Sequence, residues 1–329
     1  MNSRRYFLAG GAGFIGSHFT DRLLADPGTE AVTLYDNFSS GREWHYAQHT
    51  SDRRLRVVRG DVKDFGALRE AMLGTDGRGH DAVIHLASNP DIARAATEPD
   101  IDFREGTFLT QQVVEAMRVT ATPRLLYASG SGVYGDLGEI EATENYAPMQ
   151  PVSTYGASKL AGEALIASYC AMFGLTARVF RFGNVVGPRQ THGVGFDFVR
   201  RLLDDPTRLR ILGDGSQSKS YIHVLDVVNA VLLAHRECLR PFEAYNVATG
   251  DYITVTEIAK LAEEVAGLEP GSVRFEYAGG DRGWKGDVPV VRLNTDRIQS
   301  LGWRCLRTSR QALCVSMRAL LEDAKEGKL

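Results

Sequence analysis

The chain has 329 residues, enough for one large domain or two smaller ones. Its 38 Lys and Arg residues nearly balance its 41 Asp and Glu residues, which gives a net charge of −3. This balance, without any basic run, argues against nucleic acid as a partner. No apolar stretch is long enough to cross a membrane, and no histidine pair has the spacing of a zinc hydrolase. We therefore expect no membrane partner and no metal. The four cysteines form no CxxC pair, which is typical of reduced residues in a cytoplasmic protein.

Short apolar runs alternate with helical patterns in the first part of the chain. Strands are expected at 6–10, 31–36, 55–61, 82–88 and 124–129, and helices at 14–26, 64–74 and about 100–119. A long helix at about 154–173 and a strand at 176–184 follow. Continuous apolar strands that alternate with amphipathic helices indicate an α/β protein with a parallel sheet covered on both faces.

The pattern changes after residue 184. A loop rich in Gly and Pro is followed by shorter elements, with helices expected near 195–203, near 223–238 and around 308–326. These shorter elements predict a second, smaller α/β domain in the C-terminal part of the chain.

A glycine-rich loop lies between the first predicted strand and the first predicted helix. Gly10, Gly13 and Gly16 form a GxxGxxG pattern there. Such glycines permit a tight turn, bring backbone N–H groups near a pyrophosphate and let the helix pack closely on the strand. Asp36 ends the next strand, where a carboxylate accepts hydrogen bonds from the adenine ribose and repels a 2′-phosphate. The loop therefore predicts a Rossmann-type, doubly wound sheet that binds NAD rather than NADP.

Tyr155 and Lys159 are four residues apart in the sequence YGASK, on one face of the long predicted helix. A free tyrosine has a pKa near ~10, too high for a base at neutral pH, and a nearby ammonium lowers that pKa because it favours the phenolate. In this geometry the lysine can also hydrogen-bond a ribose hydroxyl and hold the nicotinamide. We therefore expect Tyr155 to be a catalytic base and Lys159 to be its partner.

These motifs resemble those of the extended short-chain dehydrogenases/reductases, in the family of NAD-dependent nucleotide-sugar epimerases and dehydratases. The similarity extends over essentially the whole chain. Within the family, the segment NVVGPRQTHGVGFDF resembles UDP-galactose 4-epimerases more than dehydratases. The matching segments are GGAGFIGSH (10–18), DNFSSG (36–41), GDV (60–62), HLAS (85–88), SGVYG (131–135), YGASK (155–159), RFGNVVGPR (181–189), GDGSQSKSYIHVLDV (213–227), GWKGDV (283–288) and LGW (301–303).

The resemblance implies a reversible redox cycle at C4 of a nucleotide sugar, as in UDP-galactose (UDP-glucose) 4-epimerases. In that cycle the Tyr155 phenolate takes the proton of the 4-hydroxyl, the C4 hydride moves to NAD, and the 4-keto sugar turns before the hydride returns. The resemblance also implies an NAD-binding domain over 1–182, with a returning segment at about 221–247, and a mainly substrate-binding domain over 183–329. By the same analogy, the helices at 100–119 and 154–173 form the interface of a homodimer.

The resemblance also assigns the remaining site residues by their places in the motifs. Lys219 stands where relatives usually have an arginine, Arg282 is displaced by two residues from the usual position, and Asp287 is expected to hold the nucleotide ribose or Arg282. The residues expected to bind NAD are Gly10, Gly13, Phe14, Ile15, Gly16, Asp36, Asn37, Ser39, Ser40, Gly41, Asp61, Val62, Leu86, Ala87, Ser88, Tyr155, Lys159 and Phe182. The residues expected to bind the nucleotide sugar, with UDP as the expected nucleotide, are Asn184, Arg189, His192, Lys219, Tyr221, Arg282 and Asp287.

One hydroxyl of the family's usual site is absent. Relatives have Ser or Thr four residues before the tyrosine of the VYG motif, where this chain has Gly130, and that hydroxyl relays the sugar's proton. Ser129 and Ser131 flank the glycine, and in a regular strand both point to the face opposite residue 130. Three possibilities stay open: a bulge that re-aims Ser131, a water in the free space, or loss of the relay. Ser131 is the first candidate for the substitute hydroxyl and Ser129 the second. Gly106 stands where relatives often have an asparagine, and together with Gly130 it predicts a roomier pocket or altered chemistry.

The same stretch separates the reaction classes of the family. Dehydratases and decarboxylases carry an acid two residues before that tyrosine, and dehydratases often have two adjacent acids, where this chain has Ser131 and Gly132. Elimination needs such a carboxylate, whereas epimerisation at C4 does not. The first hypothesis is therefore an isomerase, a UDP-sugar 4-epimerase. The alternatives are a decarboxylase, dehydratase or 4-ketoreductase of the same family, and an NAD-binding sensor without catalysis.

Overall fold

The computed structural model describes residues 4–328, and these divide into two compact units. The first unit comprises 4–133, Thr154–Arg181 and Val228–Tyr245, and the second comprises Tyr134–Ser153, Phe182–Val227 and 246–328. The division after residue 181 lies within one residue of the expected boundary. In contrast, 134–153 belong to the second unit, and the returning segment begins at Val228 rather than near 221.

A seven-stranded sheet forms the centre of the first unit, in the order β12-β7-β5-β4-β1-β2-β3. Within it, β1 pairs in parallel with β2 on one side and with β4 on the other, so the strand order reverses there. In doubly wound sheets, ligands bind at the carboxyl ends of the strands beside such a reversal. The predicted Rossmann-type sheet is confirmed. The strands are β1 (Arg5–Ala9), β2 (Ala31–Asp36), β3 (Leu55–Arg59), β4 (Ala82–His85), β5 (Arg124–Gly130), β7 (Thr176–Phe182) and β12 (Phe242–Val247).

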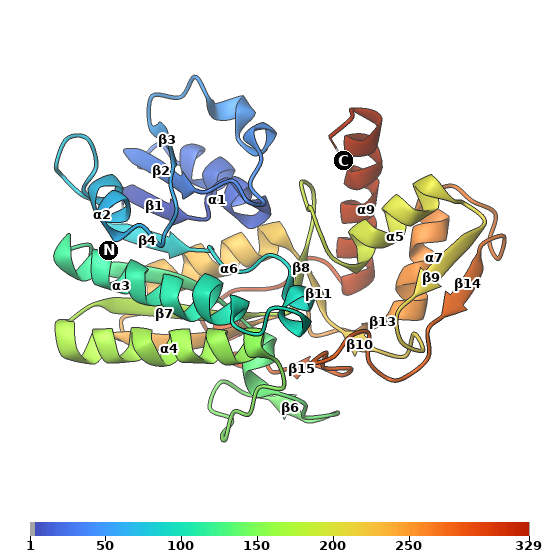
Figure 1. The fold of residues 1–329 in the computed structure, drawn as a ribbon. Coiled ribbons are helices and arrows are strands. Elements are labelled where there is room, and N and C mark those ends of the chain that lie inside the picture. Colours follow the sequence, from blue (N-terminus) through green and yellow to red (C-terminus); the bar gives the residue numbers. More distant parts are fainter. Residues whose placement is uncertain (1–3, 329) are drawn as a thin grey trace. The chain divides into compact units, whose positions relative to one another are not determined.

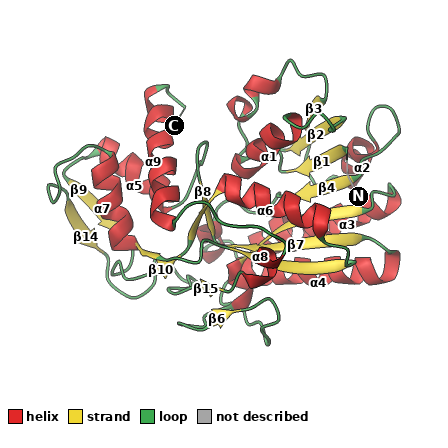
Figure 2. Cartoon of the chain, turned by 180° about the vertical axis from the view of Figure 1, so that it is seen from behind, coloured by secondary structure: helices red, strands yellow, loops and turns green. Residues whose placement is uncertain are grey.

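Helices cover both faces of this sheet. On one face α2 (Phe65–Leu73), α3 (Phe108–Val119) and α4 (Thr154–Phe173) lie side by side (Figure 1). On the other face lie α1 (Phe14–Leu24) and α6 (Val224–Glu237), which are nearer the viewer in Figure 2. The expected helix over 100–119 is present over 101–119, and it includes a π-helical turn, η4 (Phe103–Thr107), directly before α3.

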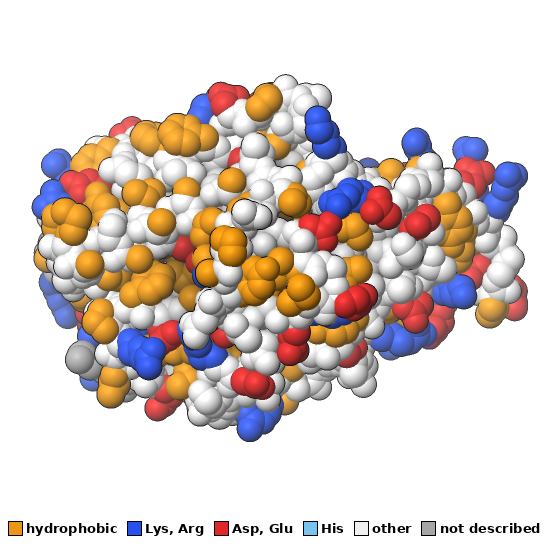
Figure 3. Space-filling view, turned by 90° about the horizontal axis from the view of Figure 1, so that it is seen from below, with side chains coloured by type: hydrophobic (Ala, Val, Ile, Leu, Met, Phe, Trp, Pro, Cys, Tyr) orange, Lys and Arg blue, Asp and Glu red, His pale blue; other side chains and the backbone are white. Residues whose placement is uncertain are grey.

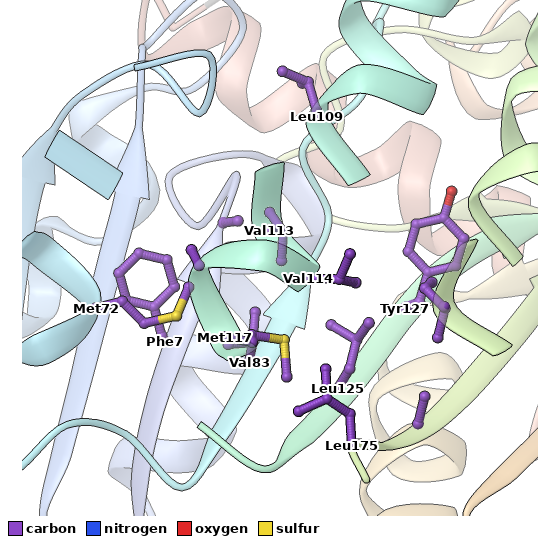
Figure 4. Packing of buried hydrophobic residues seen from close by; sticks show 14 of the residues in the cluster. Phe7, Met72, Val83, Leu109, Val113, Val114, Met117, Leu125, Tyr127 and Leu175 are labelled. Atoms are coloured by element: carbon purple, nitrogen blue, oxygen red, sulfur yellow. The ribbon is translucent and has the colours of Figure 1, made fainter. Parts of the chain in front are cut away.

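Neighbouring residues of β1 supply the cores on the two faces. Phe7 packs with Met72 of α2 and Met117 of α3 (Figure 4). The preceding residue, Tyr6, points to the opposite face, where its ring meets that of His235 on α6 edge-on at 6.3 Å. Because side chains alternate along a strand, a continuous apolar run is required when both faces are covered.

The second unit consists of helices and short paired strands. Its core lies among α5, α7 and α9, and includes Phe198, Leu261 and Leu313. The strands pair as β10 with β13, β11 with β8, β14 with β9 and β15 with β6. Within the described residues, no helix is both long and apolar enough to span a membrane. The elements are β6 (Glu141–Ala142), β8 (Asn184–Val186), α5 (Val194–Asp204), β9 (Arg208–Ile211), β10 (Ser218–Lys219), β11 (Tyr221–His223), β13 (Ile253–Thr254), α7 (Val255–Val265), β14 (Arg274–Tyr277), β15 (Arg292–Leu293), α8 (Asp296–Ser300) and α9 (Ser309–Lys325).

Candidate active site

The loop after β1 leaves room only for backbone. Gly10 has a φ of +80°, and a Cβ there would lie 2.7 Å from the amide nitrogen of Ala87. A Cβ at Gly16 would lie 2.5 Å from the carbonyl oxygen of Gly11. Gly13 is the N-cap of α1 and provides no side-chain hydrogen bond, so the N–H groups of the first turn remain for a ligand. This cradle fits the pyrophosphate of a dinucleotide.

Asp36 is buried at the end of β2 and is held by backbone donors. Its Oδ2 accepts a hydrogen bond from Ala12 N at 2.9 Å, and its Oδ1 accepts one from Phe38 N at 2.8 Å. Burial raises the pKa of Asp36, while these two hydrogen bonds and the charge of Arg59 lower it. Each carboxylate oxygen has a second lone pair for a further donor, which fits a ribose hydroxyl.

The other residues of the expected NAD set lie along the same edge of the sheet. Ser88 differs from the rest because its hydroxyl is buried and no described residue lies in standard hydrogen-bond geometry to it. Such a group is available to a ligand. By element, Phe14 and Ile15 begin α1; Asn37, Ser39, Ser40 and Gly41 follow β2; Asp61 and Val62 follow β3; Leu86, Ala87 and Ser88 follow β4; and Phe182 ends β7.

Lys159 is buried on α4 and is held by the end of β5. Its Nζ donates a hydrogen bond to the Ala128 carbonyl at 2.9 Å and lies 5.5 Å from the centre of the Tyr155 ring. Burial lowers the pKa of Lys159 to about 8, although the carboxylates of Asp102 and Glu163 raise it. The side chain therefore stays mainly protonated at neutral pH and places a positive charge beside Tyr155.

Tyr155 is half-buried one turn before Lys159. Burial raises the pKa of Tyr155 to about 12, the nearby Ser88 hydroxyl lowers it, and the Asp102 carboxylate raises it. Because part of the side chain is exposed, solvent moderates the effect of burial. A phenol with so high a pKa becomes a base near neutral pH only when a further positive charge is bound beside it.

The two serines that flank Gly130 have different surroundings. Ser129 donates a hydrogen bond to Glu163 Oε1 at 2.6 Å inside the protein, so its hydroxyl is already engaged. The strand β5 ends at Gly130, and Ser131–Tyr134 form a 3-10 turn, η5. Ser131 is half-buried in this turn and is no longer constrained by the alternation of the strand. A Cβ at Gly130 would meet no atom within 4 Å, so the space beside it is open.

A buried ion pair anchors this end of the sheet, and sequence reasoning missed it. Arg181 of β7 donates to Glu163 of α4 through Nε at 3.1 Å and through Nη2 at 2.6 Å. Both side chains are about as buried as the surrounding core, at 4% exposure. The signal in the sequence was a single charged residue in an otherwise uncharged stretch of each element, over 160–173 in α4 and over 179–182 in β7. The pair holds the Ser129 hydroxyl, and thereby the strand whose Ala128 carbonyl binds Lys159.

Gly106 allows two segments to pack closely. It lies in η4, and a Cβ there would be 2.6 Å from Ser158 Oγ and 3.0 Å from Ser158 Cβ on α4. The space of the usual side chain is therefore taken up by packing between η4 and α4. The expected roomier pocket does not arise at Gly106, and the open space is at Gly130 alone.

Replacing Gly106 with Ala is expected to lower the free energy of unfolding by about 1–3 kcal/mol, because Ser158 must move. Gly130→Ala is the matched control, since its new methyl group meets open space and is expected to leave stability unchanged or slightly raised. Urea denaturation of the two variants measures the difference. Equal stability of both would contradict the packing described for Gly106.

In the second unit, three of the expected substrate-binding residues lie together. Lys219 Nζ is 2.5 Å from Asp287 Oδ1. Arg282 donates to the main-chain carbonyl of Asp287 and, at 2.6 Å, to Asp136 Oδ2. Asp287 thus holds Lys219 through its carboxylate and Arg282 through its backbone. Asp136, which sequence reasoning did not single out, completes this group.

The other expected substrate-binding residues of this unit lie in β8, in β11 and in the loop before α5. Asn184 begins β8 and pairs in register with Tyr221 of β11, and its Nδ2 donates to the Ser220 carbonyl at 3.2 Å. Burial raises the pKa of Tyr221. Arg189 and the exposed His192 lie in the loop before α5. In the part of the chain that the structure describes, no three His, Cys, Asp or Glu residues gather as a metal site.

The structure has a doubly wound sheet with a glycine cradle after its first strand. A later helix carries a tyrosine four residues before a buried lysine. This combination is typical of an extended short-chain dehydrogenase/reductase. The family model described as "NAD dependent epimerase/dehydratase family" matches residues 6–248, and the chain belongs to that family.

Comparisons with individual proteins agree with this assignment. The chain is 31% identical to the UDP-glucose 4-epimerase of Mycolicibacterium smegmatis over 309 residues, which cover 91% of this chain and 93% of that protein. A solved UDP-galactose 4-epimerase is 36% identical, with a TM-score of 0.82 over 97% of this chain and 99% of that one. The UDP-glucose 4-epimerase of Thermus thermophilus, solved with NAD, is 30% identical, with a TM-score of 0.84 over 96% of this chain and 99% of that one. The relatives also include dTDP-glucose 4,6-dehydratases.

Proposed function

We propose that the protein is an NAD-dependent 4-epimerase of a nucleotide sugar, with a UDP-hexose as substrate, acting through a transient 4-keto sugar. The observation that carries the proposal is the Tyr155–Lys159 pair, whose lysine is buried, held by Ala128 and kept mainly cationic. The pair occurs in a chain that is similar to UDP-glucose 4-epimerases over nearly its whole length.

The residues present fit NAD. The cradle of Gly10 and Gly16 would accommodate a pyrophosphate, Asp36 keeps lone pairs for a ribose hydroxyl, and the buried Ser88 hydroxyl lies near the phenol that must be activated. Bound NAD supplies a reversible hydride acceptor and a positively charged ring. That charge is of the sign needed to lower the pKa of Tyr155 from about 12.

The chain's own residues move the proton. Tyr155 takes the proton of the sugar 4-hydroxyl as a phenolate and returns it at the end of the cycle. Lys159 favours the phenolate through its charge and is itself fixed by the Ala128 carbonyl. Ser131, at the start of η5 beside the open space at Gly130, supplies the relaying hydroxyl in this proposal.

The proposal also assigns residues of the second unit to binding of the nucleotide diphosphate. Lys219 and Arg282 are positive groups linked through Asp287, and we assign them to the phosphates of the substrate. Asn184, Tyr221, Arg189 and His192 remain candidates for contacts with the rest of the substrate. Titration of UDP against Lys219→Met and Arg282→Met tests this assignment, and unchanged UDP affinity in both variants would refute it.

A 4,6-dehydratase is the second candidate, because dehydratases are among the relatives. The turn η5 argues against it, since Ser131 and Gly132 stand where a dehydratase needs a carboxylate. Incubation with UDP-glucose, UDP-galactose and their N-acetyl and uronic forms, followed by product separation, decides between them. Interconversion of a 4-epimeric pair supports the epimerase, and release of a 4-keto-6-deoxy sugar supports the dehydratase. No conversion of any sugar by the NAD-loaded protein would instead favour a sensor.

Replacing Ser131 with Ala is expected to lower epimerase turnover by about 10²-fold, because a positioned proton-transfer group is lost. Adding Gly130→Ser to that variant is expected to restore much of the rate, since the new side chain enters open space. Steady-state kinetics of the single and double variants measure both effects. Unchanged turnover in Ser131→Ala would assign the relay to water and refute this role of Ser131.

The proposal includes a homodimer formed through α3 and α4. Apart from the buried Lys159 and Glu163, α4 carries no charged residue. Its exposed positions are therefore apolar or small and include Ala164, Met172 and Phe173. Figure 3 shows this side from below, with hydrophobic and uncharged side chains over much of the left part, where α4 lies. An uncharged helix face of this kind is typical of a surface that a partner covers.

Replacing Ala164 with Glu is expected to convert the dimer to a monomer, because it places a charge in the middle of the apolar face of α4. Val315→Glu introduces the same charge at an exposed apolar position of α9 and is expected to leave the dimer intact. Sedimentation equilibrium of both variants measures the mass. A dimeric Ala164→Glu protein would rule out this interface.

We also place the protein in the cytoplasm. The four cysteines are free thiols, which is usual in a reducing compartment, and Cys170 is buried in the core. Cell fractionation with an antibody against the protein tests the location.

A further inference from the structure

A buried carboxylate lies beside the Tyr155–Lys159 pair. Asp102, at the start of η4, is 1% exposed. Its Oδ1 accepts a hydrogen bond from Asn89 Nδ2 at 2.9 Å, and its Oδ2 accepts one from Thr154 Oγ1 at 2.7 Å. A carboxylate withdrawn from water is costly unless donors compensate it, and here each oxygen has one.

Asp102 joins the two segments that carry the groups around the reacting phenol. Asn89 directly follows Ser88 in the loop after β4, and Thr154 directly precedes Tyr155 at the start of α4. The same Asn89 also fixes its own loop, since its Nδ2 donates to the Asp91 carbonyl and its Oδ1 accepts from Asp91 N. The hydrogen bonds of Asp102 therefore set the position of the Ser88 loop relative to the first turn of α4.

A second contact lies one turn further along the same two segments. Gly106, four residues after Asp102, packs against Ser158, four residues after Thr154. The hydrogen bond and the close packing together hold η4 against the turn of α4 that contains Tyr155 and Lys159. Without a side chain at position 106, η4 approaches α4 closely enough for the Asp102 carboxylate to reach Thr154.

The titratable groups that face the pair come from four elements. Asp102 of the η4 segment and Glu163 of α4 both raise the pKa of Lys159, and Asp102 also raises that of Tyr155. His85 of β4 is uncharged at neutral pH, because burial lowers its pKa to about 3. Tyr127 of β5 is likewise uncharged, because burial raises its pKa. Asp102 is thus the anion that acts on both members of the pair.

We propose that Asp102 is a positioning residue for the epimerisation, which aligns Tyr155 with the Ser88 loop and sets the pH range over which the Tyr155–Lys159 pair is active. This inference rests on the proposed function. The alignment of Tyr155 and the effect of the Asp102 charge can be measured separately. Alignment affects the rate at every pH, whereas the charge affects the pH values at which the rate rises and falls.

The test is Asp102→Asn, which keeps the shape of the side chain and removes its charge. The amide can still accept from Asn89 and can donate to Thr154, whose hydroxyl accepts as well as donates. The rate rises with pH as Tyr155 loses its proton and falls as Lys159 loses its own. Without the anion, both groups release their protons more readily, so both limbs of the turnover–pH profile are expected to move to lower pH by about one unit.

Asp100→Asn is the matched control. It makes the same change two residues away, where the carboxylate is exposed and pairs with Arg104 on the surface. The profile of this control is expected to coincide with that of the unaltered protein. Asp102→Glu, which restores the charge on a longer side chain, is expected to return the limbs towards their original positions even where the rate stays reduced.

A second readout does not depend on turnover. Tyrosine labelled at Cζ reports the ionisation of Tyr155 in the NAD-loaded protein by NMR, with the signal assigned by its loss in Tyr155→Phe. A shift of this titration to lower pH in Asp102→Asn supports the proposal even if no sugar is converted, in which case the proposed function alone fails. Unmoved limbs and an unmoved titration in Asp102→Asn would overturn the proposal and leave Asp102 as a structural contact only.

Discussion

Replacing Tyr155 with Phe is expected to lower epimerase turnover by about 10²–10⁴-fold while NAD remains bound. The substitution removes the group that takes the sugar's proton but keeps the ring, which packs at the start of α4 near Lys159. The residues of the glycine cradle and Asp36 are unaffected. Turnover is measured by product separation, and bound NAD is quantified in extracts of the purified variant.

Tyr169→Phe is the control for this change. It removes a phenolic hydroxyl from the same helix, one that donates to Glu115 of α3 at 3.1 Å. Its turnover is expected to stay close to that of the unaltered protein. If Tyr155→Phe retained full turnover with NAD bound, Tyr155 would not be the base, and the mechanism proposed here would be wrong.

Replacing Arg181 with Met is expected to lower the free energy of unfolding by about 3–5 kcal/mol. The substitution leaves the Glu163 carboxylate buried, with the Ser129 hydroxyl as its remaining donor among the hydrogen bonds described. Urea denaturation, followed by a probe in the first unit, measures the loss. Two-state analysis applies only if that unit unfolds in a single transition, so spectroscopic probes from both units are compared.

Two further variants separate the effect of burying a charge from the effect of pairing it. Arg208→Met breaks an exposed pair with Asp205 and is expected to change stability much less than Arg181→Met does. Replacing both partners of the buried pair, as Arg181→Met with Glu163→Leu, is expected to recover much of the lost stability, because neither partner then leaves the other as an unpaired buried charge. If Arg181→Met were as stable as Arg208→Met, the buried pair would contribute little to the fold.

The sheet could be predicted from the sequence because its strands are buried on both faces. The expected range 31–36 is that of β2, and the expected helix 154–173 has the observed bounds of α4. Local composition did not reveal where η4 replaces a regular helix, because the close approach of Gly106 to Ser158 depends on residues far apart in the chain. The sequence also did not decide between a bulge, a water and loss of the relay at Gly130. The structure ends β5 at Gly130 and places Ser131 in a turn.

The candidate site was predictable where its residues have fixed spacing. Gly10, Gly16, Tyr155 and Lys159 belong to motifs that are recognisable without a structure. Asp102, however, was missed, because a buried carboxylate and a solvated one look alike in a sequence when the partners lie elsewhere in the chain. For the same reason, the ion pairs of Arg181, Glu163 and Asp136 were not predicted, since each of these residues pairs with one at least 18 positions away.

Glu163 couples two properties that are usually adjusted separately. Its carboxylate joins β5 to β7 through Ser129 and Arg181, and it also raises the proton affinity of Lys159. A substitution of Glu163 that alters this anchorage is therefore expected also to alter the pH at which Lys159 loses its proton. Heat tolerance and alkali tolerance are expected to change together when this one side chain is replaced.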